Sequence, residues 1–341
     1  MVPVPNSALT PQELKARKDA KNKAKAEAKA AKKRRNNEFR EAMKTQTKPP
    51  PPSLYLYDDA RVRAERLVQV ISTSLFASTF SSPSEDRQAR ERGAELMKLM
   101  TANSFTQENM NDKVALWGYT RHKFSKRALL TFDSLRLLEK TGALPTFFPS
   151  PPEAIFSIGE GPSNDLLGAL AFINHTFPSA PAPTCKGFDN HCSEWSPITS
   201  KFNDALASTF SPPPHPPTHE FLDITDPNLP PTLSAPPTPT LFLFSYVLHE
   251  TKPLYQPFLL ALFAASPPNS LFYFAEPTPQ QLLLLLTRLF PSLKRGVDYT
   301  FLDSSIQIPS LEPTLKRTGP AVILLKKPET PPVAPPEALS T

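Results

Sequence analysis

The chain has 341 residues, 43 of them proline, with 39% hydrophobic residues and a formal net charge of +6. This length accommodates one α/β domain, a smaller helical part and some tail, and the proline content predicts folded segments joined by proline-rich connectors. The longest apolar stretches, at 241–248 and 282–286, are too short to cross a membrane, and the polar N-terminus lacks the apolar core of a signal peptide. We therefore expect a soluble intracellular protein without membrane contact.

Cysteine is sparse, since only Cys185 and Cys192 are present. Two cysteines exclude a disulfide framework and a zinc site built from cysteines alone. The nearby His175 and His191 do not complete any common zinc-ligand spacing. We expect two ordinary thiols and no metal site.

Positive charge is concentrated near the N-terminus. Residues 13–48 contain fourteen Lys/Arg and five Asp/Glu, a net of +9, so the other residues sum to −3. This segment has high helix propensity but almost no apolar face, so it cannot bury itself. Residues 1–52 are therefore predicted to form a basic arm, either disordered or a lone solvated helix, that ends in the polyproline run at 49–52.

A helical subdomain is predicted over residues 53–149. Apolar residues recur at helical spacing over 58–80, 84–100 and 111–140. The last of these helices is expected to break near Gly118. Gly142 follows it at the position of a glycine that ends a helix in the left-handed conformation.

From residue 150 to 327, strand-like and helix-like runs alternate, which predicts an α/β domain with a mostly parallel sheet and helices on both faces. Seven strands are expected, at 154–158, 185–189, 219–222, 240–247, 270–275, 299–303 and 322–326. Helices are expected at 163–175, 195–210, 254–265 and 278–290. Residues 328–341 are predicted to be a disordered tail.

A glycine-containing turn follows the first expected strand, with the sequence Ile158-Gly159-Glu160-Gly161-Pro162. Three of the chain's nine glycines fall within residues 159–168. Glycine lets the backbone take positive φ and lets a ligand approach closely. The next helix, for which Ser163 is an expected cap, directs free N–H groups at the crevice where open α/β sheets bind ligands.

This turn resembles motif I of the class I S-adenosylmethionine-dependent methyltransferases. The resemblance implies a Rossmann-like fold over about 170 residues. It implies S-adenosyl-L-methionine as cofactor, bound at Gly159, Glu160, Gly161 and Pro162. The third small residue of the motif is Ser163 here, in place of glycine. The resemblance further implies that Asp189 binds the ribose hydroxyls and that Asp223 faces the adenine amine; alternatively, Asp189 is a loop acid or helix cap.

Polar residues end the fourth expected strand, where motif IV of the same family meets the methyl group and the substrate. Ser245 is expected on the cofactor side, and the catalytic candidates are Tyr246, His249 and Glu250. His249 is a candidate base because histidine titrates near neutral pH. Alternatively, His249 and Glu250 simply begin the next helix. The resemblance also implies that the last strand is an antiparallel edge strand.

Several other chemistries are excluded by missing motifs. The sequence has no Gly-x4-Gly-Lys-Ser/Thr phosphate loop and no Gly-x-Ser-x-Gly nucleophile elbow. The fourth strand ends without the Asn/Asp-Pro-Pro-Tyr/Phe motif of exocyclic amino methyltransferases and without a cysteine for covalent catalysis. A ring nitrogen, a hydroxyl or a protein side chain remains as the methyl acceptor.

The substrate is predicted from the distribution of charge. The basic arm suits phosphate contacts, and Lys32-Lys33-Arg34-Arg35 resembles a nuclear or nucleolar address, with the cytoplasm as the alternative. Residues 117–127 interleave aromatics with cations, which suits RNA binding by the Arg121–Arg127 region or, equally, aromatic packing in a core beneath solvated lysines.

Residues 119–129 are also faintly similar to a segment of fungal large-subunit ribosomal RNA uridine-N3 methyltransferases. We therefore predict methyl transfer to RNA, and to ribosomal RNA in particular. The alternatives are a protein or small-molecule methyltransferase, and a non-catalytic binding protein on a degenerate methyltransferase fold.

Overall fold

The computed structural model describes residues 58–77, 79–102, 104–210, 214–236, 238–277, 279–302 and 321–326. All of them belong to one compact unit that begins at Tyr55. The predicted arm at 1–52 and tail at 328–341 lie outside the described residues, and the boundary predicted at residues 149 and 150 stays a prediction.

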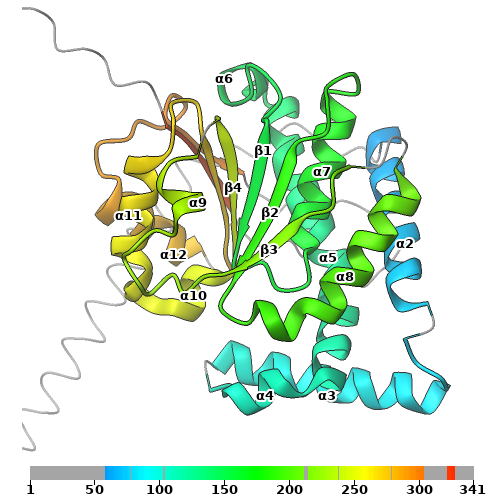
Figure 1. The fold of residues 1–341 in the computed structure, drawn as a ribbon. Coiled ribbons are helices and arrows are strands. Elements are labelled where there is room, and N and C mark those ends of the chain that lie inside the picture. Colours follow the sequence, from blue (N-terminus) through cyan, green and yellow to red (C-terminus); the bar gives the residue numbers. More distant parts are fainter. Residues whose placement is uncertain are drawn as a thin grey trace, which may run out of the picture. The chain divides into compact units, whose positions relative to one another are not determined.

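A seven-stranded sheet forms the centre of this unit (Figure 1). Its strands are β1 (Ala154–Ile158), β2 (Thr184–Asp189), β3 (Thr218–Phe221), β4 (Thr240–Ser245), β5 (Leu271–Ala275), β6 (Tyr299–Leu302) and β7 (Ala321–Leu325). They lie in the order β3-β2-β1-β4-β5-β7-β6, and β7 is antiparallel to both of its neighbours. The order and the directions confirm the predicted fold class.

The antiparallel direction predicted for the last strand is confirmed, but its predicted edge position is wrong. β6 pairs with the far side of β7 and forms the edge. The reason lies in burial: all five residues of β7 are buried, whereas three of the four residues of β6 are only half-buried. A strand that is apolar on both faces belongs inside a sheet.

Helices cover both faces of the sheet. One face carries α2 (Asp59–Phe76), α5 (Lys113–Lys140), α7 (Asn164–Thr176) and α8 (Cys192–Thr209). The other carries α9 (Pro231–Ser234), α10 (Val247–Thr251), α11 (Gln256–Ala265), α12 (Pro279–Leu284) and the π-helical turn η3 (Leu285–Leu289). The remaining helices are α3 (Pro83–Ala102), α4 (Gln107–Asn111), α6 (Leu144–Phe147) and the 3-10 turn η2 (Lys252–Tyr255). None of the described helices combines the length and the apolarity needed to span a bilayer.

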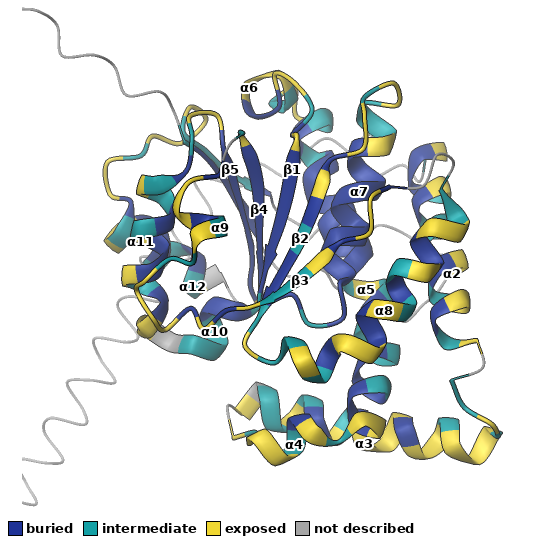
Figure 2. Ribbon diagram, viewed as in Figure 1, coloured by how far each residue is buried: buried dark blue, intermediate teal, exposed yellow. Residues whose placement is uncertain are grey.

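Two hydrophobic cores result from the alternation of side chains along the strands. Leu241 and Leu243 of β4 face the core shared with α5 and α7, whereas Phe242 and Phe244 face the core under α10 and α11. On that second face, Phe242 stacks on Phe272 of the neighbouring strand, with ring centroids 4.8 Å apart. The central strands β4 and β5 are buried along their whole length because both faces of the sheet are covered there, as their dark blue colour in Figure 2 shows.

The fourth strand is shorter than predicted. It ends at Ser245, because Tyr246 has a φ of +66° and Val247 already begins α10. Most other predicted strands agree with the structure to within one residue at either end, and the predicted helix at 254–265 begins as α11 only at Gln256. Gly142 has the predicted left-handed conformation, with a φ of +73°.

The predicted break of the third helix near Gly118 is wrong, since α5 runs unbroken through it. Gly118 instead marks the point where α3 crosses α5. A Cβ at Gly118 would lie 1.7 Å from the carbonyl oxygen of Ala89, and a Cβ at Gly93 would lie 2.1 Å from the carbonyl carbon of Gly118. Both glycines are present because the two helix backbones touch.

Gly118→Ala is therefore expected to destabilise the protein. The added methyl group must push α3 away, which costs about 1–3 kcal/mol or more in a packed core, although alanine gains about 1 kcal/mol of helix propensity. Denaturant unfolding measures the difference. Gln88→Ala, on the exposed side of α3, is the control and should stay within about 0.5 kcal/mol of wild type. Equal stability of both variants would contradict the close crossing.

A second close contact joins α5 to α7, the helix that follows the glycine turn. A Cβ at Gly168 would lie 2.2 Å from the carbonyl oxygen of Ala128. In the same interface the Thr131 hydroxyl donates a hydrogen bond to the Asp165 carboxylate, with an Oγ1–Oδ1 distance of 3.0 Å. The helix α5 is thus held directly against the element that begins at the candidate site.

Candidate active site

A cavity of about 320 Å³ opens where β1, β2 and β4 end. This carboxyl edge is the place where open α/β sheets bind ligands. The structure brings six of the predicted site residues together in its lining, namely Gly159, Gly161, Asp189, Asp223, Ser245 and Glu250. The other four, Glu160, Pro162, Tyr246 and His249, are not among the residues that line it.

The glycine turn has the backbone conformation expected of it. Gly159 and Gly161 have φ angles of +66° and +56°, and the N–H of Gly159 donates to the carbonyl of Phe188 at 2.8 Å. A Cβ at Gly159 would lie 2.7 Å from Cγ2 of Val247, whereas one at Gly161 would lie 3.7 Å from the Trp195 ring. The space at Gly159 is therefore filled in part by α10, and the more open backbone is that of Gly161.

Asp189 braces this turn from the end of β2. Its Oδ2 accepts from the N–H of Gly161 at 2.9 Å, and its Oδ1 accepts from the N–H of His191 at 2.8 Å. Burial raises the pKa of Asp189, and the two N–H groups oppose that rise. A carboxylate oxygen accepts more than one hydrogen bond, so each retains capacity for a ligand hydroxyl.

Glu160 points away from the cavity, beneath the sheet edge. Its Oε2 lies 2.8 Å from Nδ1 of His219 on β3. It occupies space that Gly187 leaves open, since a Cβ there would lie 1.2 Å from the same oxygen. Burial raises the pKa of Glu160, and His219 opposes that rise. Glu160 therefore fastens the turn to β2 and β3, which the motif alone could not reveal.

Ser163 was expected to cap α7 with its side chain, and it does not. Its φ is +65°, and its side chain makes no capping hydrogen bond. A capping serine needs an extended backbone to aim its hydroxyl at the first free N–H groups, and the left-handed conformation prevents this. The position has the backbone that glycine adopts most easily, as in the motif it resembles.

Asp223 and Ser245 enter the cavity lining from β3 and β4. Asp223 lies beyond the end of β3, and its Oδ1 accepts from both the N–H and the hydroxyl of Thr225, at 2.8 and 2.7 Å. Ser245 is the last residue of β4 and is buried. Leu222 and Ile224, which flank Asp223, add an apolar surface beside them.

The three catalytic candidates that follow β4 differ in whether they line the cavity. Glu276, buried at the end of β5, accepts from the N–H groups of Leu248 and His249 at 3.0 and 3.2 Å and so caps α10. Both His249 and Glu250 lie within α10, and of the two only Glu250 reaches the cavity lining. The N–H of Tyr246 donates to the carbonyl of Ala275 at 2.7 Å, which fixes the sharp turn.

The Glu250 carboxyl is in an environment that suits proton transfer. Burial raises its pKa to about 7, Arg127 opposes the rise, and Asp189 adds to it. A base with a pKa near the working pH is the most effective in proton transfer. Among the predicted catalytic residues, Glu250 therefore has both the position and the acidity for this role.

Arg127 of α5 is a site residue that the sequence analysis grouped with the RNA-binding region. It lines the cavity, and its Cζ lies 4.3 Å from the centroid of the Tyr246 ring and 5.9 Å from that of Tyr119. Within the described part of the chain, no carboxylate lies within ion-pair distance of it. Its spacing from the buried Phe124 and Thr131 places it on the buried side of α5, where an arginine signals a site.

Most of the other lining residues are apolar or aromatic, and Asn190, His191, Thr225 and Thr251 complete the wall. The helical part contributes Met100, Phe105, Met110 and Tyr119, and the sheet side contributes Trp195, Leu222, Val247 and Leu254. Tyr119 and Trp195 lie with their ring centroids 5.8 Å apart. Such a wall suits a planar, largely apolar ligand held by a few polar groups.

The cysteines take no part in the cavity lining. Cys185 is buried in β2 and Cys192 is half-buried at the start of α8. Among the described residues, no three His, Cys, Asp or Glu side chains lie close enough together to hold a metal ion.

No family model and no curated protein matches this sequence. Among solved structures, similarity is found to the CurJ carbon methyltransferase, with 14% identity over 75% of this chain and 70% of that chain, at a TM-score of 0.41. The 16S rRNA methylase RmtB is 16% identical to this chain. The match covers 74% of this chain and 78% of that chain, at a TM-score of 0.34. Human N-acetylserotonin methyltransferase in complex with SAM is 13% identical to this chain. The match covers 62% of this chain and 59% of that chain, also at a TM-score of 0.34.

The fold class follows from the chain's own topology. The order β3-β2-β1-β4-β5-β7-β6, with only β7 antiparallel, is that of the class I S-adenosylmethionine-dependent methyltransferases. The chain therefore has the fold of these enzymes, with an N-terminal helical region in front of it.

Proposed function

We propose that this protein is an S-adenosylmethionine-dependent methyltransferase. The observation that carries the proposal is the convergence, in one cavity at the carboxyl edge of the sheet, of the glycine turn, Asp189 and Arg127. In this proposal the bare backbone of the turn meets the methionine part of the cofactor, while the N–H groups of the turn keep their bonds to Phe188 and Asp189. Asp189 accepts hydrogen bonds from the ribose hydroxyls of the cofactor, and Arg127 pairs with the carboxylate of its methionine part.

The remaining lining residues complete the cofactor site in this proposal. Asp223 faces the adenine amine, and the apolar Leu222 and Ile224 beside it contact the adenine ring. Ser245 lies at the end of β4, between the glycine turn and α10, and contacts the methionine part.

The proposed chemistry uses Glu250 as a general base. The bound cofactor supplies a methyl group on a positively charged sulfur, which leaves as a neutral thioether. Glu250 accepts the proton that the acceptor atom loses as that atom forms its bond to the methyl carbon. The apolar wall excludes water, and the cavity aligns the acceptor with the methyl group, which contributes most of the rate.

Isothermal titration of the full chain with S-adenosylmethionine tests the proposal. We expect saturable binding, and Asp189→Asn should weaken it by about 10-fold or more, because a hydrogen bond to a charged group contributes about 1.5–3 kcal/mol. Asp226→Asn is the matched control, since Asp226 is exposed and does not line the cavity. The absence of binding at millimolar ligand would overturn the proposal.

For the acceptor we propose RNA, and ribosomal RNA in particular, with a nuclear or nucleolar location. Support comes from the basic arm, with a net charge of +9 over residues 13–48, and from the cations between Arg121 and Arg127. The aromatics of that region serve the core: Phe124 is fully buried against Phe202, with ring centroids 5.9 Å apart. RNA contacts by this region therefore fall to its cations.

Three experiments separate this acceptor from the alternatives. Mass spectrometry of ribosomal RNA nucleosides with and without the gene should reveal one missing methylated nucleoside. Deletion of residues 1–48 should weaken RNA binding and reduce its salt dependence. If the affinity and its salt dependence stay unchanged, the arm does not contact RNA. Cofactor binding without turnover on total RNA or lysate would favour a non-catalytic binding protein.

A further inference from the structure

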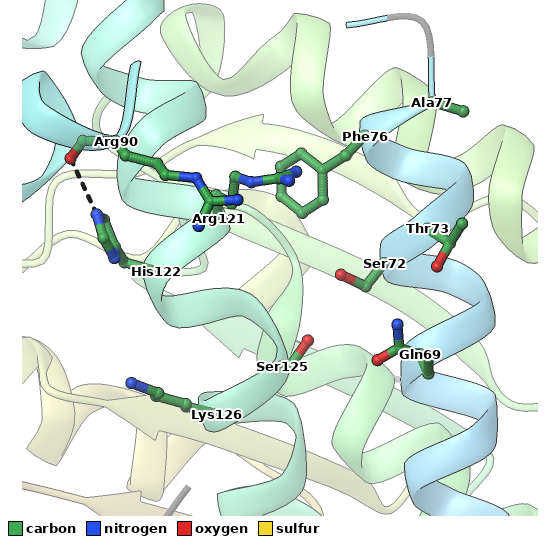
Figure 3. A pocket seen from close by; sticks show the side chains of 10 residues that line it. All are labelled: Gln69, Ser72, Thr73, Phe76, Ala77, Arg90, Arg121, His122, Ser125 and Lys126. Carbon is green, nitrogen blue, oxygen red and sulfur yellow. Dashed lines mark hydrogen bonds between the residues drawn. The ribbon is translucent and has the colours of Figure 1, made fainter. Parts of the chain in front are cut away.

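A second cavity, of about 630 Å³, lies between α2 and α5 (Figure 3). We call it the α2–α5 groove; the residues used below are Gln69, Ser72, Arg90, Arg121, Ser125 and Lys126. The described residues that line it include no carboxylate, but they include three permanent cations and His122. None of these side chains serves the proposed methyl transfer, so the groove has a separate purpose.

The two arginines of the groove are held in place by one acid behind it. Asp86 pairs through Oδ2 with Nε of Arg90 at 3.0 Å and through Oδ1 with Nε of Arg121 at 2.9 Å. The ion pairs therefore use the Nε side of each guanidinium. The Arg121 side chain retains 28% exposure and the Arg90 side chain 50%, so part of each side chain is accessible to a ligand.

One further contact orients the Arg121 guanidinium, and another joins α5 to the backbone of α3. The Cζ atom of Arg121 lies 5.0 Å from the centroid of the Phe76 ring, and His122 Nε2 lies 2.9 Å from the carbonyl oxygen of Arg90. One carboxylate against Arg90, Arg121 and Lys126 leaves the groove with a positive charge. Arginine nitrogens in a fixed fork match the oxygens of a phosphate group.

Neutral hydrogen-bond donors line the space between the cations. Figure 3 shows Gln69 and Ser72 of α2 and Ser125 of α5 pointing into the gap between the two helices. Amide and hydroxyl groups of this kind donate to phosphate oxygens in nucleic-acid complexes. The groove therefore offers two kinds of donor to an anion that bears several oxygens.

The α2–α5 groove adjoins the active-site cavity through one turn of α5. Lys126 lines the groove and Arg127, the next residue, lines the cavity. Lys123 lies one turn earlier on the same helix, and burial, then Arg127 and Lys126, lower its pKa. Consecutive residues of α5 thus line the groove and the cavity, and both carry a positive charge.

We propose that the α2–α5 groove binds the phosphodiester backbone of the RNA segment next to the methylated nucleotide. The inference rests on the proposed methyl transfer to RNA and adds the place where the flanking chain lies. RNA carries one negative charge per nucleotide, so the phosphates that flank a nucleotide at the active site are suitable ligands for the cations of the groove. An acidic peptide would use the same cations but has no planar base for the cavity.

The test is RNA binding by the full chain, measured with a single-stranded oligouridylate at several salt concentrations. Arg121→Gln combined with Lys126→Gln should weaken binding by about tenfold or more at low salt. The slope of log affinity against log salt should flatten by about 1.4, which corresponds to about 0.7 for each lost phosphate contact. The control is Lys98→Gln combined with Lys113→Gln, which removes two exposed cations outside the groove. It should change the RNA affinity and the salt slope less than the groove variant does.

The outcomes separate the groove from the proposed function. If wild-type protein fails to bind the RNA, the RNA proposal itself fails. If it binds and both double variants behave alike, the groove proposal is overturned while methyl transfer to RNA stands. Equal displacement of the RNA by poly-glutamate at matched charge would overturn the phosphodiester assignment in favour of an acidic protein partner.

Three further measurements guard against a folding defect. S-adenosylmethionine affinity should be equal in wild type and in the Arg121/Lys126 double variant, because neither residue lines the active-site cavity. The single variant Lys126→Glu, at an exposed position, should by itself weaken RNA binding. Photocrosslinking of 4-thiouridine RNA should label a peptide that contains Ser125 or Lys126; labels confined to other segments would contradict the groove.

Discussion

Replacement of Glu250 by glutamine is expected to lower kcat by about 10²–10⁴-fold, the range that general-base catalysis contributes. Affinity for S-adenosylmethionine should stay nearly unchanged, because glutamine keeps the shape of the side chain and α10 keeps its cap at Glu276. Single-turnover methylation measures the chemical step separately from binding. His249→Ala is the matched control on the same short helix and should retain activity, since His249 does not line the cavity.

The pH dependence of the reaction offers a second readout of the same residue. Burial raises the pKa of Glu250 to about 7, and the base is active only when ionised, so wild-type activity should rise with pH through about 7 and then level off. The glutamine variant should lose this rise. A large loss in His249→Ala with little loss in Glu250→Gln would assign the base to His249 instead.

Stability should respond to the same group with a predictable sign. The pKa of Glu250 rises from 4.5 to about 7 on folding, so the native state binds this proton more tightly than the unfolded state. Its contribution to stability therefore falls as pH rises from about 4.5 to 7. The glutamine variant lacks this penalty and should unfold at a higher temperature than wild type at pH 8, but not at pH 4.

Arg127→Gln is the second change with a large expected effect. Loss of a guanidinium paired with the cofactor carboxylate should weaken S-adenosylmethionine binding by about 10–100-fold, because a hydrogen bond to a charged group contributes about 1.5–3 kcal/mol. Isothermal titration measures this directly. Lys123→Gln removes the same charge one turn away, outside the cavity lining, and should have a small effect.

A conservative variant distinguishes charge from shape at this position. Arg127→Lys keeps the cation but loses the planar group that lies 4.3 Å from the centroid of the Tyr246 ring, so it should recover only part of the lost affinity. Equal cofactor affinity in wild type and Arg127→Gln would show that Arg127 does not hold the carboxylate. A thermal shift in the glutamine variant without loss of affinity would mark Arg127 as a packing residue.

The sheet could be predicted from sequence because its signals are local. Strands that are apolar on both faces, such as β4 and β5, read as continuous runs, and the glycine turn between β1 and α7 has an unusual composition. The end of β4 was harder to predict. The positive φ of Tyr246 depends on its hydrogen bond to Ala275 and on the capping of α10 by Glu276, both distant in sequence.

The site was only partly predictable for the same reason. Residues after β1, β2 and β4 follow from strand order, since parallel strands end at one edge. Arg127 reaches that edge from α5, and Met110 and Phe105 reach it from the segment around α4. Which residues of a helical subdomain cover a sheet edge depends on tertiary packing, and no local pattern specifies it.

One consequence of the helix packing concerns the choice of substrate. Two close backbone contacts, at Gly118 and Gly168, pin α5 against α3 on one side and α7 on the other, and a helix advances only about 1.5 Å per residue. The relative positions of Lys126 and Arg127 on α5 are therefore fixed by the fold. Under the proposed methylation of RNA, an incoming strand must supply the matching bend, so the protein would select its target by the shape of the RNA around the nucleotide.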